Sequence, residues 1–233
     1  MKLFIDTANI DEIREAASWG VLDGCTTNPS LIAKEGRNFA EAIATICDIV
    51  KGPVSAEVVA QDTEGMLREA ALLKQISEHV VIKLPMSHAG LAACRALADE
   101  GTPVNMTLIF SVNQALLAAK AGAAYVSPFI GRIDDTGQDG LVVLADIIDV
   151  FNTYYFETEV LAASIRHTAH ALQAARLGSH VSTMPFGVMK AMCHHPLTDK
   201  GNARFMADWA TVPGDGLEAT VQTFLDSSRK ASA

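Results

Sequence analysis

The sequence predicts an α/β protein of the (β/α)8 barrel class, also called a TIM barrel, formed as a single domain. The chain has 233 residues, of which 49% are hydrophobic, so it can bury one large core. Single barrels of about 200 to 250 residues are common. Short apolar, β-branched runs alternate with longer stretches of helical periodicity, as in βα units around a parallel sheet. Eight such runs favour a closed barrel, because an open doubly wound sheet rarely uses eight regular units.

The eight expected strands are short runs rich in apolar and β-branched residues. No GxGxxG or GxxxxGK[ST] motif follows any of them, so the phosphate loop of a nucleotide-binding sheet is missing. The strands are expected at Lys2 to Asp6, Gly24 to Thr27, Val54 to Val58, Val80 to Leu84, Val104 to Leu108, Tyr125 to Phe129, Val160 to Ser164 and His180 to Met184.

Helices are expected between these strands and after the last one. The segment Thr63 to Ser77 has helical apolar spacing, and Ser111 to Ala121 opens on a good N-cap serine. Two further helical stretches follow the eighth strand, around Phe186 to Cys193 and Asp199 to Ala210. We expect a catalytic barrel domain over residues 1–212 and a C-terminal tail over 213–233. That tail is either a helix at a subunit interface or a frayed terminus.

Composition and charge exclude several function classes. The net charge of −9 is spread along the chain without basic runs, so neither nucleic acid nor an anionic membrane is an expected partner. The N-terminus MKLFIDTANID lacks the layout of a signal peptide, and no apolar run approaches the roughly 20 residues that span a bilayer. A soluble, cytoplasmic protein is therefore expected. The scattered cysteines are expected to be reduced, mostly buried thiols: Cys25, Cys47, Cys94 and Cys193.

Polar residues cluster where the expected strands end, which is the rim that carries the active sites of such barrels. Where one strand supplies two of them, they are two positions apart and should share a face. We therefore expect one inward-facing ring of residues, polar apart from Phe129, made of Asp6, Thr26, Asn28, Glu57, Lys83, Asn105, Thr107, Ser127, Phe129, Ser164 and Arg166.

Lys83 is the sharpest single signal, because VVIKLP places an ammonium inside an apolar strand, where an unpaired charge is costly. Desolvation favours the neutral amine, which is the nucleophile that forms an imine with a ketone. The alternative is a structural lysine that snorkels to the rim or pairs with Glu57 or Asp6. Asp6 and Glu57 supply the two carboxyl groups that imine chemistry needs as acid and base, although Asp6 could instead cap a helix or turn.

Other charged groups suggest an anion site and no metal. Arg132 and Arg166 follow the sixth and seventh strands, and guanidinium groups match phosphate oxygens, although each alone could be a surface salt bridge. His194 and His195 are adjacent and diverge on a helix, so a metal site is not expected. The other histidines are interpreted as caps or surface residues.

The segments FIDTAN, GCTTNPSLI, VIKLP, NMTLIFS, YVSPFIGRIDD and LAASIR, in this order, resemble the transaldolase family. The resemblance covers essentially the whole chain and is to the small, barrel-only subfamily that includes the fructose-6-phosphate aldolases. It implies that Lys83 is the Schiff-base lysine and that Asp6 takes the donor hydroxyl proton as the C3–C4 bond breaks. It also implies that Glu57 acts through a water held by Thr107. By the same resemblance Asn28, Asn105 and Ser127 hold the dihydroxyacetone hydroxyls, Thr26 lines the floor, and Arg132, Ser164 and Arg166 clamp the phosphate.

Three residues match the transaldolase branch of that family. Transaldolases have Glu, Asn and Phe at the positions of Glu57, Asn105 and Phe129, where the aldolases typically have Gln, a residue other than Asn, and Tyr. The resemblance thus implies a cofactor-free transaldolase of the pentose phosphate pathway with sugar-phosphate substrates. It also implies a homo-oligomeric ring of subunits, of which a decamer is one form. The alternatives are a fructose-6-phosphate aldolase that releases free dihydroxyacetone, and a non-catalytic barrel that binds sugar phosphates.

Overall fold

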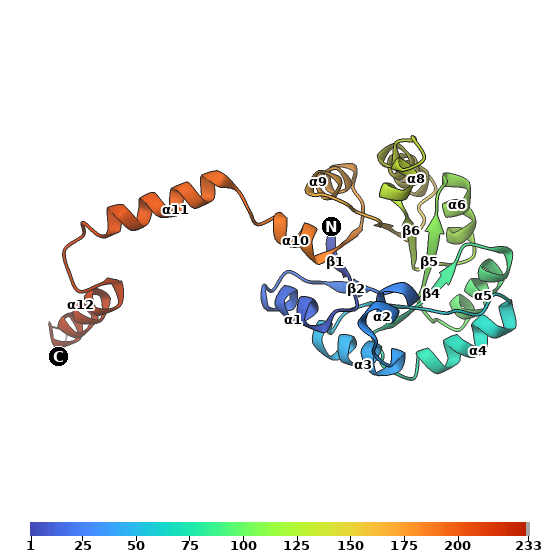
Figure 1. Ribbon diagram of the computed structural model, residues 1–233, viewed down its shortest axis with the longest axis horizontal. Helices are drawn as coiled ribbons and strands as arrows, with labels where there is room; N and C mark the ends of the chain where they lie inside the picture. The colour runs from blue at the N-terminus through green and yellow to red at the C-terminus, as the bar shows by residue number, and fades with distance from the viewer. Residues whose placement is uncertain (232–233) are drawn as a thin grey trace. The chain divides into compact units, whose positions relative to one another are not determined.

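The computed structural model describes residues 1–231, without the side chains of the last two of these, and confirms the predicted barrel. All neighbouring strands are parallel, and the sheet closes on itself in chain order through the pairing of β1 with β8. Figure 1 shows the helices around these strands. The strands are β1 (Lys2–Asp6), β2 (Gly24–Thr26), β3 (Val54–Glu57), β4 (Val80–Pro85), β5 (Val104–Ile109), β6 (Tyr125–Pro128), β7 (Glu159–Ala162) and β8 (Val181–Met184).

The observed strands agree with the predicted ones to within one or two residues at each end, and two local departures have a physical cause. Leu108 has φ +59°, and the register between β5 and β6 shifts between Met106 and Ile109, so β5 carries a bulge just after the residues expected in the site. The predicted seventh strand ran to Ser164, but β7 ends at Ala162. Ser164 has φ +56°, which no extended strand accommodates.

Most helices of the barrel begin at residues whose side chains accept hydrogen bonds from the first free backbone N–H groups. Asn9, Asn38, Asp62, Ser87 and Ser111 all act in this way. The barrel helices are α1 (Ile10–Ser18), α2 (Pro29–Glu35), α3 (Phe39–Val50), α4 (Thr63–Leu73), α5 (His88–Asp99), α6 (Val112–Lys120), α7 (Ile130–Asp134), α8 (Gly140–Thr153), α9 (Thr168–Leu177) and α10 (Phe186–Ala191).

Two apolar layers support the barrel. The larger lies between the strands and the surrounding helices, and includes Met106. The smaller consists of Phe4, Leu161, Ala163 and Val181. Because Phe4 is two residues before Asp6, and Val181 two before Thr183, the smaller cluster fills the barrel interior beneath the rim.

Gly24 makes room for the largest side chain of this interior cluster. It pairs in register with Phe4, and a Cβ atom on it would lie 2.4 Å from Cε1 of the Phe4 ring. The ring itself is 1% exposed and packs 6.3 Å from the ring of Tyr125. Only a glycine therefore fits beside the ring on β2.

The chain packs as two compact units, one ending at Met192 and the other beginning at Cys193. The second contains α11 (Pro196–Trp209) and α12 (Leu217–Ala231). No described side chain of α11 is buried, and its Leu197, Phe205 and Met206 are exposed. The functional division expected at residue 212 and the interface role of the tail remain predictions. Within residues 1–231, no helix is both long and apolar enough to cross a membrane.

Candidate active site

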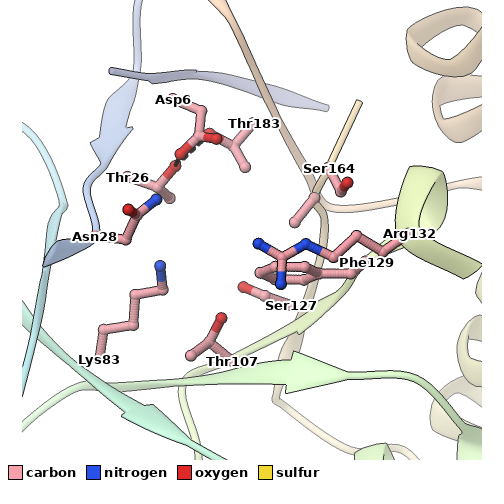
Figure 2. A pocket seen from close by; sticks show the side chains of 11 residues that line it. Asp6, Thr26, Asn28, Lys83, Thr107, Ser127, Phe129, Arg132, Ser164 and Thr183 are labelled. Atoms are coloured by element: carbon pink, nitrogen blue, oxygen red, sulfur yellow. Dashed lines mark hydrogen bonds between the residues drawn. The ribbon is translucent and has the colours of Figure 1, made fainter. Parts of the chain in front are cut away.

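A pocket opens at the mouth of the barrel, where the carboxyl ends of the strands meet. Its empty space, counting the part open to solvent, is about 420 Å³. Figure 2 shows the side chains converging on it from several strands and from the loop after β7. The lining residues are Asp6, Thr26, Asn28, Lys83, Thr107, Ser127, Phe129, Arg132, Ala163, Ser164 and Thr183.

Lys83 lies in β4 beside Glu57 of β3, with which it pairs in register. Its Nζ atom is 3.0 Å from Oε2 of Glu57 and donates a 2.9 Å hydrogen bond to the carbonyl oxygen of Thr27. The Lys83 side chain is 6% exposed and the Glu57 side chain 14%. The buried ion pair considered from the sequence is therefore present, and the same contact places a carboxylate within proton-transfer distance of the amine.

Asp6 lies on the other side of the pocket, at the end of β1 (Figure 2). Its Oδ1 atom accepts a 2.7 Å hydrogen bond from the hydroxyl of Thr26, which is also 2.7 Å from the hydroxyl of Thr183. Burial raises the pKa of Asp6 above its ordinary value, against the opposing effects of the Lys83 charge, the Thr26 hydrogen bond and the Arg132 charge. Asn9, and not Asp6, caps the helix that follows.

A second hydrogen-bonded row runs below Lys83. The amide nitrogen of Asn105 donates to the hydroxyl of Ser55 at 3.0 Å, and the amide oxygen accepts from the hydroxyl of Ser127 at 2.7 Å. Asn105 is fully buried and reaches the pocket through Ser127. Thr107 lines the pocket directly, and its buried hydroxyl has no hydrogen-bond partner among the described residues. An unpaired hydroxyl at this position suits a bound water or a ligand group.

Arg132 projects into the pocket from the short helix α7. Its guanidinium carbon lies 4.7 Å from the centre of the Phe129 ring, which holds the cation in place (Figure 2). The ring of Phe110 packs edge-on against that of Phe129, with centres 5.8 Å apart. Ser164 completes this side, because its carbonyl oxygen accepts a hydrogen bond from the backbone of Gly131 beside the arginine.

Arg166 departs from the expected arrangement. Its guanidinium forms two hydrogen bonds with the carboxylate of Asp135, at 2.8 and 2.5 Å, and it does not line the pocket. The expectation that Ser164 and Arg166 share one strand face is wrong, because the positive φ of Ser164 ends the strand alternation before Arg166. Asn28 does line the pocket, and its side chain also caps α2.

Two polar residues at the site were missed from the sequence. Thr183 lines the pocket, and Ser55 holds the amide of Asn105. Both lie two positions from inward-facing residues, Thr183 after Val181 and Ser55 before Glu57. The two-residue period of the strands could therefore have identified them.

The histidines serve mainly as structural groups. His167 and His195 cap α9 and α11. His170 is not the cap or surface residue expected, since it is buried and its Nε2 atom lies 3.1 Å from the carboxylate of Asp134. Burial lowers the pKa of His170. Across residues 1–231, no group of His, Cys, Asp and Glu side chains is arranged to hold a metal ion. Cys25, Cys47 and Cys94 are buried thiols, as predicted, while Cys193 is exposed.

The sequence matches one family model and several named relatives. The family model described as transaldolase/fructose-6-phosphate aldolase matches residues 3–233. A probable transaldolase of Kosmotoga olearia is 58% identical over 218 residues, which is 93% of this chain and 100% of the relative. Probable transaldolases of Methanococcus maripaludis and Thermoanaerobacter sp. are 56% and 57% identical, each over 90% of this chain and 97% of the relative.

Two solved structures share the fold alone. A thiamine phosphate pyrophosphorylase from Pyrococcus furiosus has a TM-score of 0.55 and 15% identity, over 79% of this chain and 85% of the other. A putative lactate oxidase from Pediococcus acidilactici has a TM-score of 0.59 and 16% identity, over 80% of this chain and 63% of the other. The family follows from the matches along the sequence: this chain belongs to the transaldolase/fructose-6-phosphate aldolase family.

Proposed function

We propose that the protein is a transaldolase that transfers a dihydroxyacetone unit through a Schiff base on Lys83. The donor is sedoheptulose 7-phosphate and the acceptor glyceraldehyde 3-phosphate, giving erythrose 4-phosphate and fructose 6-phosphate, as in the pentose phosphate pathway. The observation that carries this proposal is the buried Lys83 amine, which opens into the pocket with the Glu57 carboxylate 3.0 Å away.

The first half of the reaction needs a neutral amine and a route for a proton. Glu57 takes a proton from Lys83, and the free amine attacks the C2 carbonyl of the donor. Glu57 then returns the proton to the carbinolamine hydroxyl, which leaves as water and yields the imine. A water held between Glu57 and Thr107 would carry these protons, and the unpaired hydroxyl of Thr107 supports that role.

The second half breaks and remakes a carbon–carbon bond. Asp6 takes the proton of the C4 hydroxyl, the C3–C4 bond breaks, and its electron pair moves into the imine to give an enamine on Lys83. The aldose formed from C4 onward leaves. The enamine then attacks the aldehyde carbon of the acceptor, Asp6 returns the proton to the new hydroxyl, and water releases the ketose from Lys83. No metal takes part, since the imine nitrogen serves as the electron sink.

Substrate binding is assigned to the two walls of the pocket. Asn28 and Ser127, with Asn105 behind Ser127, would hold the dihydroxyacetone hydroxyls, while Thr26 lines the floor. The phosphate would meet Arg132 and Ser164 at the mouth, and Arg166 beyond them. Arg132 is preset for this role by its contact with the Phe129 ring.

The Phe129 ring also favours transfer over release of free dihydroxyacetone. An apolar ring offers the enamine neither a proton nor a hydrogen-bonded water, so the enamine survives until an acceptor aldehyde arrives. A tyrosine at position 129 would place a phenolic hydroxyl near the enamine. The Glu57 carboxylate and the Asn105 amide agree with this assignment, because transaldolases carry both.

Borohydride reduction tests the proposal directly. Incubation with fructose 6-phosphate and borohydride should add a reduced three-carbon or six-carbon unit to Lys83, detectable by mass spectrometry. Lys83→Ala should abolish the adduct, and an adduct that persists in this variant would refute the assignment. Measuring free dihydroxyacetone with and without erythrose 4-phosphate separates transfer from aldolase activity. A protein that binds sugar phosphate without forming any adduct would be a binding module instead.

A further inference from the structure

Three neighbouring strands contribute one row of hydrogen-bonded groups to the pocket wall. Thr183 lies on β8, Asp6 on β1 and Thr26 on β2. The hydroxyl of Thr26 lies 2.7 Å from the hydroxyl of Thr183 and 2.7 Å from Oδ1 of Asp6, and both contacts are drawn as dashed lines in Figure 2. Thr183 is 2% exposed and Thr26 3%, so bulk water does not compete strongly for these bonds. The proposed reaction gives Asp6 and Thr26 roles, whereas Thr183 has had none.

The number of protons fixes the direction of this row. A threonine hydroxyl has one hydrogen to donate, and that of Thr26 goes to Oδ1 of Asp6. While Asp6 is ionised and can only accept, Thr183 must therefore be the donor and Thr26 the acceptor in the contact between the two threonines. Oδ1 already accepts one hydrogen bond, and among the described residues no hydrogen bond reaches Oδ2. Oδ2 is the oxygen left to take the substrate proton.

We propose that Thr183 is a positioning residue for Asp6, one that donates its hydroxyl hydrogen to Thr26 and so holds the Asp6 carboxylate in the ionised, proton-accepting form. This inference rests on the proposed function, in which Asp6 is the base. If the hydroxyl of Thr183 is removed, Thr26 is free to turn, and it loses the polarisation that strengthens its own bond to Asp6.

The charged groups around Asp6 make such support necessary. Lys83 from β4, Arg132 from α7 and the Thr26 hydrogen bond all stabilise the carboxylate. Burial has a larger, opposite effect, so the pKa of Asp6 is raised. The nearby Cys25 thiol stays neutral, because burial raises its pKa as well. Glu57 is paired with Lys83 and offsets part of that positive charge. Because burial already disfavours the charged form, the loss of one supporting hydrogen bond raises the pKa of Asp6 further.

The test compares Thr183→Val, which keeps the shape and replaces the hydroxyl by a methyl group, with Thr183→Ser, which keeps the hydroxyl. The measurement is kcat/KM against pH, whose acid limb reports protonation of an essential base in the free enzyme. In Thr183→Val the acid limb should move to higher pH by about 0.3 to 0.5 units. At pH values below the acid limb, kcat/KM of Thr183→Val, scaled to its own plateau, should therefore be roughly two- to threefold lower than the scaled wild-type value.

Two controls separate this effect from a change in packing. The acid limb of Thr183→Ser should stay at the wild-type pH. The same is expected of Ser182→Ala, since Ser182 is a buried neighbour whose hydroxyl has no hydrogen-bond partner among the described residues. If Thr183→Val does not fold, Thr183→Cys replaces it, because a thiol is a weak donor of similar size. The acid limb of Thr183→Cys should lie at a higher pH than that of the wild type.

Borohydride trapping of fructose 6-phosphate distinguishes failure of this inference from failure of the proposed function. Trapping on Lys83 does not require Asp6 to act as a base, so Thr183→Val should still form the adduct at the plateau pH. An unshifted acid limb in a variant that traps normally would overturn the role of Thr183. A shift of equal size in Ser182→Ala would overturn it too. Absence of trapping in the wild type would instead refute the proposed function.

Discussion

Replacing Gly24 by alanine should strain the floor of the barrel beneath Asp6. The added Cβ atom would lie 2.4, 2.5 and 2.7 Å from three carbon atoms of the Phe4 ring, all inside normal contact distance. The ring cannot move freely, since it is 1% exposed and packs against Leu161, Ala163 and Val181. Overpacking of this kind costs about 1 to 3 kcal/mol. For a unit of this size, that cost corresponds to a fall in Tm of roughly 2 to 12 °C.

Urea denaturation of the full chain, followed by far-UV circular dichroism, measures this cost. Gly187→Ala is the matched control, because an added Cβ atom there meets nothing within 4 Å and Gly187 lies in helix α10. It should stabilise the protein by about 0.5 to 1 kcal/mol. Combining Gly24→Ala with Phe4→Leu should recover at least about 0.5 kcal/mol relative to the sum of the single changes. Strict additivity, or a loss no larger than in the control, would refute the packing argument.

Three other predictions concern the rim of the pocket. Glu57→Gln should lower kcat by about 10²- to 10⁴-fold while KM changes only a few fold, and equal loss of both would indicate a merely structural glutamate. Ser164→Gly should raise stability by about 0.5 to 1 kcal/mol in denaturant melts, because glycine tolerates the φ of +56°, and should raise KM for phosphorylated donors. Asp135→Ala should release the Arg166 guanidinium from its ion pair and so tighten competitive inhibition by inorganic phosphate roughly threefold. Unchanged or weaker inhibition would show that Asp135 instead holds Arg166 in position for the anion.

Most of the fold could be predicted because strand and helix periods are local properties of the sequence. The strands alternate with capped helices of regular length, and strand ends were off by only one or two residues. The bulge at Leu108 and the left-handed backbone of Ser164 were not predictable, since neither residue type favours positive φ. Tertiary contacts impose these conformations, and only the folded structure shows them.

The site could be predicted as far as strand alternation holds. Residues within strands, such as Lys83 and Thr107, lie where their positions indicated. Arg166 does not, because the alternation stops at Ser164. The partner of Arg166, Asp135, is 31 positions away, and no local pattern indicates that contact. Thr183 lies on β8, a strand on which no site residue was predicted, although the two-residue period of the strand places it on the inward face.

The apolar plug formed by Phe4, Leu161, Ala163 and Val181 has a consequence for the order of events in the proposed reaction. Among the described residues, this cluster fills the barrel interior below the site, and the pocket that reaches Lys83 opens at the mouth, so substrates are expected to enter and leave there. The aldose released in the first half must leave before the acceptor can enter by the same path. The kinetics should therefore be of the ping-pong type, with parallel lines in double-reciprocal plots, and the departing aldose should compete with the incoming one.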